Sequence, residues 1–372
     1  MFIYALNSPI TRERYSTRLR YFFAKIGLMD RDTNNKHIEE LCRTFVDRGK
    51  QDPNWVINNI VSFLAEYKDR YDRREISGST IRNYVKVVKL LCEMNDIAIP
   101  WKKITRGLPK GRQWADDRAP SIDEIRKLSE YPDRRIKPLV YTMCSSGIRL
   151  GAWDYLRWQD VSPVIKDGEI IAARLTIYAT EEDQYHAYCT PEAYSALKSW
   201  MDYRETSGEN ITGKSWIMRD LWATLDPRIS GSINIPRKKK SSGIKRLIEN
   251  AWYSQGLRKP LEEGKTRHEF QAVHGFRKFY KTRCELAGMK PSIIEVSMGH
   301  SLGGVSDSYF RPRENEILEE YIKAVDSLTI SLTIERKTGS KEEVARLADR
   351  EELYTMVVDI IHDYVERNGR TL

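Results

Sequence analysis

Residues 145–161 read SSGIRLGAWDYLRWQDV, a largely apolar run in which Arg149 follows a Gly-Ile pair. Three further stretches combine apolar and reactive residues in the same way: VHGFRKFYKTRCELAG (273–288), MGHS (298–301) and SDSYFRP (306–312). They contribute these polar side chains: His274, Arg277, His300 and Tyr309. Guanidiniums bind phosphate oxygens, and imidazoles and phenols carry protons or act as nucleophiles. The four stretches therefore define a candidate site for chemistry on a phosphate.

The order and spacing of these residues carry more information than any one of them. His274 and Arg277 lie one helical turn apart, and Arg277 precedes His300 by 23 residues. Tyr309 follows His300 after nine residues. Each residue alone has an ordinary structural explanation. The His-Arg pair could lie on a solvent-exposed helix face and Arg149 at a helix terminus, while His300 could be a hydrogen-bonded core histidine and Tyr309 an aromatic residue that anchors a helix. The whole set in this order is much harder to explain by packing.

These stretches resemble the sequence blocks of the tyrosine recombinase (phage-integrase) family. The family's T-G-L-R-x-x-E-L-x-x-L-x-W-x-D block is similar to residues 146–160, with these residues in register: Arg149, Leu156, Trp158 and Asp160. Its H-x-L-R-H block is similar to residues 274–278, its L-G-H block to residues 298–300, and its nucleophile has the spacing of Tyr309. The resemblance covers residues 117–325. Archaeal members of the family have sequences similar to two of its stretches, SSGIRLGAWDYLRW and TPEAY (190–194).

The resemblance implies a site-specific DNA recombinase or integrase that works through a 3′-phosphotyrosyl intermediate. Arg149 and Arg277 would donate paired hydrogen bonds to the non-bridging phosphate oxygens, where charge grows in the transition state. His274 would accept or relay the tyrosine proton, and His300 would donate to a phosphate oxygen. Tyr309 would attack phosphorus and release a 5′-hydroxyl. Since the new ester stores the bond energy, the resemblance implies no ATP, no metal and no other cofactor.

One position departs from the family, which usually carries a lysine in the turn of a β-hairpin as general acid for the leaving oxygen. Here the hairpin TIYATEEDQYHAYC (176–189) has Thr180 at that position, and no lysine lies between Lys166 and Lys198. Lys166 and the Lys238–Lys240 run are the substitutes that the sequence offers. Another group as proton donor, a shifted alignment and an impaired enzyme all stay open.

The patterning predicts a mostly α protein with a small β-sheet (α+β). We expect a helical N-terminal DNA-clamping domain over 1–100, a basic linker over 101–120, a tyrosine-recombinase catalytic domain over 121–335 and a C-terminal helical extension over 336–372. The linker is rich in Lys, Arg, Gly and Pro and has no sustained apolar period. Ser121 and Glu124 have the spacing of a capping box, and residues 170–190 are typical of a β-hairpin.

Apolar residues at helical spacing predict helices over residues 11–27 and 54–71 and a third that begins at Ser79 or Thr80. On this third helix a basic stripe occupies one face: Arg82, Lys86 and Lys89. The stripe is a candidate for binding DNA phosphates, and a merely solvated surface is the alternative.

Composition agrees with a DNA-associated protein without proving it. The formal net charge is +9, and most of the excess lies in residues 1–120, which favours a polyanionic partner. No run approaches the roughly 20 apolar residues that span a bilayer, and the N-terminus lacks the basic start of a signal peptide. The five cysteines are scattered and never form a C-x-x-C pair, which disfavours disulfides and a zinc site. We expect a cytoplasmic protein associated with the nucleoid and no membrane partner.

Three rival interpretations were weighed against this one. Residues 208–215, GENITGKS, satisfy the nucleotide-binding pattern G-x-x-x-x-G-K-S, but they follow an amphipathic helix where a buried strand is required. A catalytically impaired DNA-binding protein of the same fold is supported by Thr180. A type IB topoisomerase or telomere-resolving enzyme shares the chemistry, and the compact length favours an integrase. If Tyr309 were not the nucleophile, Tyr321 would be the next candidate.

The expected partner is double-stranded DNA, with a homotetramer on synapsed sites and a monomer or weak oligomer away from DNA. Residues 341–367 have the pattern of a mixed-charge amphipathic helix. Docking of this helix on a neighbouring protomer and packing on its own domain are the two hypotheses for it.

Overall fold

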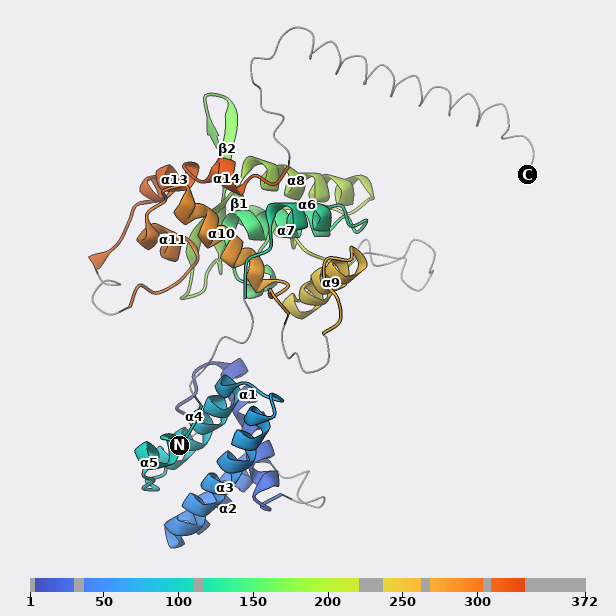
Figure 1. The fold of residues 1–372 in the computed structure, drawn as a ribbon. Coiled ribbons are helices and arrows are strands. Elements are labelled where there is room, and N and C mark those ends of the chain that lie inside the picture. The colour runs from blue at the N-terminus through green and yellow to red at the C-terminus, as the bar shows by residue number, and fades with distance from the viewer. Residues whose placement is uncertain are drawn as a thin grey trace, which may run out of the picture. The chain divides into compact units, whose positions relative to one another are not determined.

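The computed structural model describes residues 4–29, 37–109, 117–220, 237–261, 268–303 and 309–331. Helices dominate this part of the chain, which also contains a three-stranded sheet (Figure 1). The predicted class, mostly α with a small sheet, is confirmed. Within these ranges no helix has both the length and the apolar character needed to cross a membrane. The predicted C-terminal extension, 336–372, lies outside the described residues.

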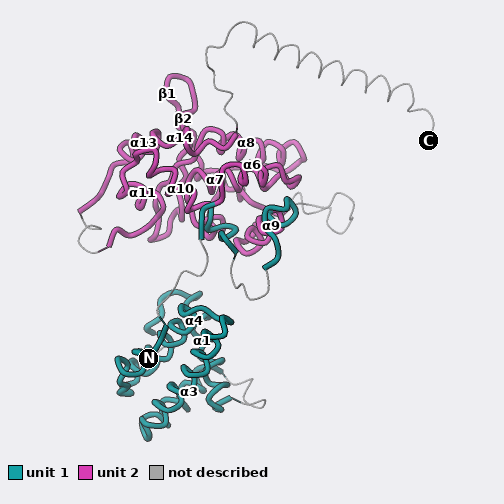
Figure 2. The backbone as a smooth tube through the Cα atoms, viewed as in Figure 1, with its two compact units in different colours: residues 1–119, 252–275 teal, residues 120–251, 276–372 magenta. Residues whose placement is uncertain are grey.

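The chain divides into two compact units (Figure 2). Unit 1 comprises residues 1–119 and 252–275, and unit 2 comprises residues 120–251 and 276–372. The first boundary coincides with the end of the predicted linker. The segment 252–275, which we placed in the catalytic domain, belongs by its contacts to unit 1.

Four helices form the N-terminal part of unit 1: α1 (Pro9–Lys25), α2 (Ile38–Gln51), α3 (Pro53–Asp72) and α4 (Gly78–Glu93). Their shared core is aromatic, since Phe22 meets Phe63 edge-on with ring centroids 5.1 Å apart and Phe63 stacks on Tyr67 at 4.4 Å. The spacing of apolar residues predicted α1, α3 and α4. The α2 helix was not predicted, although Leu41 and Phe45 are buried one turn apart along it.

A short helix, α5 (Trp101–Thr105), lies where we predicted the start of the linker. Three apolar side chains of this stretch pack against the core of the N-terminal helices: Trp101, Ile104 and Leu108. The ordered part of unit 1 therefore continues beyond Pro100, because the basic residues of the stretch alternate with apolar ones. Residues 110–116 of the predicted linker lie outside the described part.

Unit 2 is built around a deeply buried helix, α7 (Ile136–Ser146), of which only Lys137 is exposed. It packs against α6 (Ile122–Ser129), α8 (Pro191–Thr206) and the sheet. The predicted capping box at the start of α6 is confirmed, because the Ser121 hydroxyl accepts from the amide of Glu124 while the Glu124 carboxylate accepts from that of Ser121. Two 3-10 turns, Leu150–Asp154 and Trp158–Asp160, lead from α7 to the sheet.

The sheet is antiparallel, with strands in the order β1 (Val161–Lys166), β2 (Glu169–Ile177) and β3 (Tyr185–Cys189). The predicted hairpin is confirmed as β2 and β3, which pair from Ala173 opposite Cys189 to Ile177 opposite Tyr185. We predicted only a turn in the region of β1. An edge strand that contains a proline and an exposed Ile165 lacks the alternation by which strands are recognised.

The remaining helices follow in sequence: α9 (Ser241–Ser254), α10 (His274–Leu286), α11 (Pro291–Ser297), α13 (Glu314–Ile322) and α14 (Val325–Leu328). The α10 helix confirms that His274 and Arg277 lie one turn apart on a helix. Short connections between α10 and α11 bring the second and third sequence blocks together.

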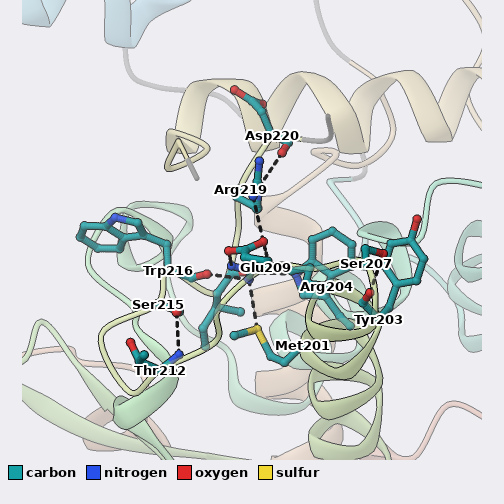
Figure 3. Close-up of polar contacts among 12 residues, drawn as sticks. Met201, Tyr203, Arg204, Ser207, Glu209, Thr212, Ser215, Trp216, Arg219 and Asp220 are labelled. Atoms are coloured by element: carbon teal, nitrogen blue, oxygen red, sulfur yellow. Dashed lines mark hydrogen bonds and ion pairs between the residues drawn. The ribbon is translucent and has the colours of Figure 1, made fainter. Parts of the chain in front are cut away.

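The GENITGKS stretch (208–215) is a structural loop after α8 (Figure 3). The side chain of Glu209 is buried between two guanidiniums, with Arg204 at 2.5 and 3.0 Å and Arg219 at 2.8 Å. The backbone of the loop is engaged as well, because the carbonyls of Gly213 and Ser215 accept from the amides of Gln159 and Trp158. A nucleotide-binding loop needs a preceding strand and outward amides, so the ATPase interpretation fails here.

The Arg204–Glu209–Arg219 triad generates a prediction about stability. Burial alone would raise the pKa of Glu209, but hydrogen bonds and charge from Arg204 and then Arg219 outweigh burial and lower it. The triad's stabilisation is therefore present at neutral pH and lost as the pH falls through this lowered pKa. We expect Glu209→Gln to lower the free energy of unfolding by roughly 3–5 kcal/mol, since two buried cations lose their partner. Urea unfolding at pH 7 measures this.

The matched control is Glu205→Gln, an exposed carboxylate in the last turn of α8, the helix that precedes the loop. We expect it to stay within about 0.5 kcal/mol of the parent. Equal stability of both variants would mean that the buried triad contributes nothing to the fold.

Candidate active site

A glycine in the left-handed region ends α7 and begins the candidate site. Gly147 has φ +62°, and a β-carbon at this position would lie 2.3 Å from the Tyr280 ring. Only glycine combines this backbone conformation with so close an approach. The turn directs the chain from the buried α7 helix toward Arg149, two residues later.

A second left-handed glycine ends α11. Gly299 has φ +65°, its amide donates to the Val296 carbonyl, and the amide of His300 donates to the Glu295 carbonyl. These two bonds are those of a Schellman motif, which brings the side chain after the glycine beside the side chain in the last helical turn. His300 and Glu295 occupy these two positions. A β-carbon on Gly299 would lie 2.5 Å from the Tyr185 ring.

The two arginines converge on the carbonyls at these helix ends. Arg277 is 4% exposed and donates to the Gly147 carbonyl and, at 3.3 Å, to that of Met298. The Arg149 Nη1 donates to the Gly299 carbonyl at 2.8 Å. The first, second and third sequence blocks are thus joined through guanidinium hydrogen bonds to backbone carbonyls.

Neither guanidinium forms an ion pair with a carboxylate of the part of the chain that the structure describes. Burial lowers the pKa of Arg277, and the charge of Arg149 lowers it further. Backbone carbonyls hold these two cations close to each other, and no described carboxylate forms an ion pair with them. Such an arrangement favours the binding of an anion.

His300 is held on both sides. Its Nε2 lies 2.6 Å from Nη2 of Arg277, and its Nδ1 lies against the carboxylate of Glu295. A guanidinium can only donate, so Nε2 accepts and the ring proton resides on Nδ1, where it is donated to Glu295. The other oxygen of Glu295 accepts from Lys281 at 2.6 Å. Burial would raise the pKa of Glu295, but these hydrogen bonds lower it overall, so the carboxylate is ionised at neutral pH.

The other two predicted site residues lie at the surface. His274 is the first residue of α10, exposed, one turn before Arg277. Tyr309 is 82% exposed, and residues 304–308 just before it lie outside the described ranges. Arg149, Arg277 and His300 are therefore the predicted residues that direct contacts bring together.

The structure also locates the positions considered for the missing lysine. Thr180 lies in the exposed turn between β2 and β3, with φ +72° and its amide bonded to the Gln184 side chain. Lys166 ends β1 and is exposed. Lys238 donates to the Asp154 carbonyl at 2.8 Å and Lys239 to the Asp220 carboxylate at 2.6 Å, so both already have acceptors.

Tyr321 does not suit the role of alternative nucleophile. It is fully buried, and its hydroxyl donates to the Ser145 carbonyl at 2.8 Å. Burial also raises the pKa of Tyr321 well above its usual value. Its contacts are those of an anchor that holds α13 against α7.

The basic stripe on α4 is largely exposed, as a phosphate-binding surface requires. Arg82 and Lys86 are exposed and Lys89 is half-buried. Arg82 donates to the Pro109 carbonyl at 3.0 Å, and Lys89 lies 3.4 Å from the Glu93 carboxylate. These contacts are weak surface interactions and do not decide between a DNA-binding face and a solvated one.

Sequence reasoning missed the residues that support the site: Gly147, Gly299, Glu295, Lys281 and Tyr185. The sequence did contain a signal for Glu295. A glycine directly before His300 is typical of a Schellman motif, and in that motif the residue five positions before the histidine lies beside it. Nothing near Tyr185 in the sequence indicates that a strand residue approaches Gly299.

The Glu295 contact predicts a single tautomer for His300. Lys281 and His300 bind different oxygens of Glu295, and in Glu295→Gln one of these positions becomes an NH2 group that can only donate. With the remaining oxygen on Lys281, the NH2 group faces Nδ1, so we expect the Nδ1-protonated form to lose its dominance. Nitrogen-15 NMR of histidine-labelled protein reports this, with the His300 signal assigned by its loss in His300→Gln. Glu285→Gln is the control, because Glu285 lies 3.8 Å from Lys281 and has no contact with His300. An unchanged His300 signal in Glu295→Gln would contradict the assignment of the ring proton.

No protein-family model and no curated protein matches the chain. Solved structures of recombinases are similar to it. The XerH site-specific recombinase in a post-cleavage complex with palindromic difH substrate is 14% identical, with a TM-score of 0.49 and 91% of this chain and 95% of that chain covered. A lambda integrase dimer bound to a COC′ core site is 13% identical, with a TM-score of 0.48 and coverage of 84% and 93%. XerA recombinase is 18% identical, with a TM-score of 0.37 and coverage of 83% and 97%. The chain is thus similar in structure to site-specific recombinases and integrases.

Proposed function

We propose that this chain is a tyrosine recombinase, a site-specific enzyme that cleaves and rejoins DNA through a 3′-phosphotyrosyl bond to Tyr309. The observation that carries the proposal is the pair of guanidiniums, Arg149 and Arg277, which backbone carbonyls hold in place without an ion pair to any described carboxylate. A DNA phosphate is an anion whose charge and geometry match paired guanidiniums.

In this proposal Arg149 and Arg277 bind the two non-bridging oxygens of the scissile phosphate. Negative charge on these oxygens grows as the nucleophile approaches, so fixed donors stabilise the transition state more than the ground state. The backbone carbonyls of Gly147 and Gly299 support the role, because they orient both guanidiniums before DNA arrives. Preorganised donors need no rearrangement at the moment of reaction.

The two histidines take different parts. His274, exposed at the start of α10, is proposed to accept the proton of Tyr309. His300 is proposed to bind a phosphate oxygen. Its Nε2 accepts from Arg277 and its Nδ1 is held by Glu295, so the imidazole lies beside a guanidinium that is proposed to bind the same phosphate.

Tyr309 is proposed as the nucleophile because its spacing from His300 matches the family and its side chain is accessible. Attack on phosphorus breaks the bond to the 5′-oxygen and leaves the 3′-phosphate esterified to Tyr309. The ester keeps the bond energy for rejoining, and the proposal therefore includes neither ATP nor a metal.

The proposal extends to the partners. Double-stranded DNA suits the net charge of +9, and Arg82, Lys86 and Lys89 are proposed as phosphate contacts. We further propose a homotetramer on synapsed sites, with a monomer or weak oligomer away from DNA. A DNA-binding protein that keeps the fold without catalysis is the second candidate, favoured by the exposed Thr180 at the position of the family's lysine.

A covalent-capture experiment tests the function. The full chain is incubated with a library of nicked duplexes with randomised sequence, and protein-bound DNA is recovered under denaturing conditions and sequenced. A suicide duplex that carries the selected site is then synthesised. We expect wild-type protein to form a covalent adduct and Tyr309→Phe to form none, because phenylalanine has no nucleophilic oxygen.

The matched control is Tyr4→Phe, since Tyr4 is 86% exposed and resembles Tyr309 in accessibility. It should form the adduct as the wild type does. An adduct in Tyr309→Phe would place the nucleophile elsewhere, and DNA binding without any adduct in the wild type would favour the non-catalytic candidate.

A further inference from the structure

Tyr185 is the first residue of β3, and its ring lies against the backbone of Gly299. The carbonyl of this same glycine accepts from Arg149. Tyr178 lies at the other end of the hairpin turn, with its ring centroid 6.2 Å from that of Tyr185. The β2–β3 hairpin therefore places a phenol beside the two guanidiniums of the candidate active site.

The Tyr185 hydroxyl is buried, and no described group accepts its proton. The charged groups around it are Arg277 and Arg149, and guanidiniums can only donate. A buried donor without an acceptor is costly, and such donors are rare in native proteins unless a ligand or water satisfies them. An acceptor that suits an O–H group beside two cations is an anion.

Resting on the proposed function, we infer that Tyr185 is a further catalytic residue, the general acid that protonates the leaving 5′-oxygen of the DNA strand. The two arginines bind the non-bridging oxygens, and the O–H of Tyr185 is a neighbouring buried proton for which no described group is the acceptor. A phosphate that reaches the buried Arg277 also reaches this hydroxyl, because the two groups adjoin.

The step is balanced in atoms and protons. The oxygen of Tyr309 bonds to phosphorus and its proton passes to His274, while the bond from phosphorus to the 5′-oxygen breaks. The 5′-oxygen takes the proton of Tyr185, whose phenolate is then stabilised by Arg277 and Arg149. In rejoining, the 5′-hydroxyl returns a proton to Tyr185 as its oxygen attacks phosphorus, and Tyr309 regains its own from His274.

The surroundings of Tyr185 suit this role. Burial raises the pKa of Tyr185 to about 12, and the charge of Arg277 opposes the rise, so the hydroxyl is protonated at neutral pH. The hairpin offers no lysine between Lys166 and Lys198, and Thr180 in its turn is exposed. A phenol at the base of the hairpin thus supplies the proton that its turn does not.

The test compares two forms of the selected suicide duplex. One has the natural oxygen at the leaving position, and the other has a bridging 5′-sulfur, which leaves as a thiolate without needing a proton. We expect Tyr185→Phe to slow adduct formation by about 10²–10⁴ on the oxygen substrate. On the sulfur substrate it should cleave at nearly the wild-type rate. The thermal unfolding midpoint of Tyr185→Phe should not fall, since no described group accepts the proton of the hydroxyl that is lost.

Tyr178 is the other tyrosine at the ends of the hairpin turn, and Tyr178→Phe is assayed in parallel on both substrates. Equal slowing of Tyr185→Phe on both substrates, no slowing on either, or sulfur rescue of Tyr178→Phe instead would each overturn the assignment to Tyr185. These outcomes leave the recombinase function intact, because the wild type still forms its adduct. Absence of an adduct from wild-type protein on both substrates overturns the function, and the inference with it.

Discussion

The hydrogen bonds from Arg277 to the carbonyls of Gly147 and Met298 are the interaction on which the candidate site depends. They join the end of α7 to the end of α11, two helices far apart in the sequence. Both helices must end in a left-handed glycine for these carbonyls to face the guanidinium, and aromatic rings pack so closely on each glycine that no other residue fits. The position of Arg149 and that of His300 follow from these two helix ends.

Two groups of arginines differ in how their charge is compensated. Arg204 and Arg219 share the carboxylate of Glu209, so their charge is compensated and the loop after α8 is fixed. Arg277 is almost as buried, but its partners are carbonyls and an imidazole, and its pKa is lowered by burial and by Arg149. An uncompensated cation costs stability, and this cost is offset only when an anion binds. The second group therefore carries charge that the described carboxylates do not neutralise through an ion pair.

The carboxylate of Glu295 stands just outside this group and connects it to the exposed surface. It accepts from His300 and Lys281 and forms no ion pair with Arg149 or Arg277, although its charge raises the pKa of Arg277 against the effect of burial. The hairpin contributes from the opposite side through Tyr185, which packs on Gly299. The two glycine turns and Tyr185 thus lie close to the arginines, and Glu295 fixes the ring proton of His300 on Nδ1.

The sequence by itself determined the mostly α class, the β2–β3 hairpin and the capping box at Ser121, because these depend on local periodicity and on spacing along the chain. The roles of the five candidate site residues remain predictions. It did not reveal β1, whose proline and exposed isoleucine hide the strand pattern, or α5, whose apolar residues pack where basic residues indicated a linker. Only the tertiary structure decided that Tyr185 packs on Gly299 and that Glu295 binds His300, and that Tyr321 is an anchor between α13 and α7. The physical reason is that these roles arise from contacts between segments distant in sequence, where burial and the partners of each polar group are set by packing.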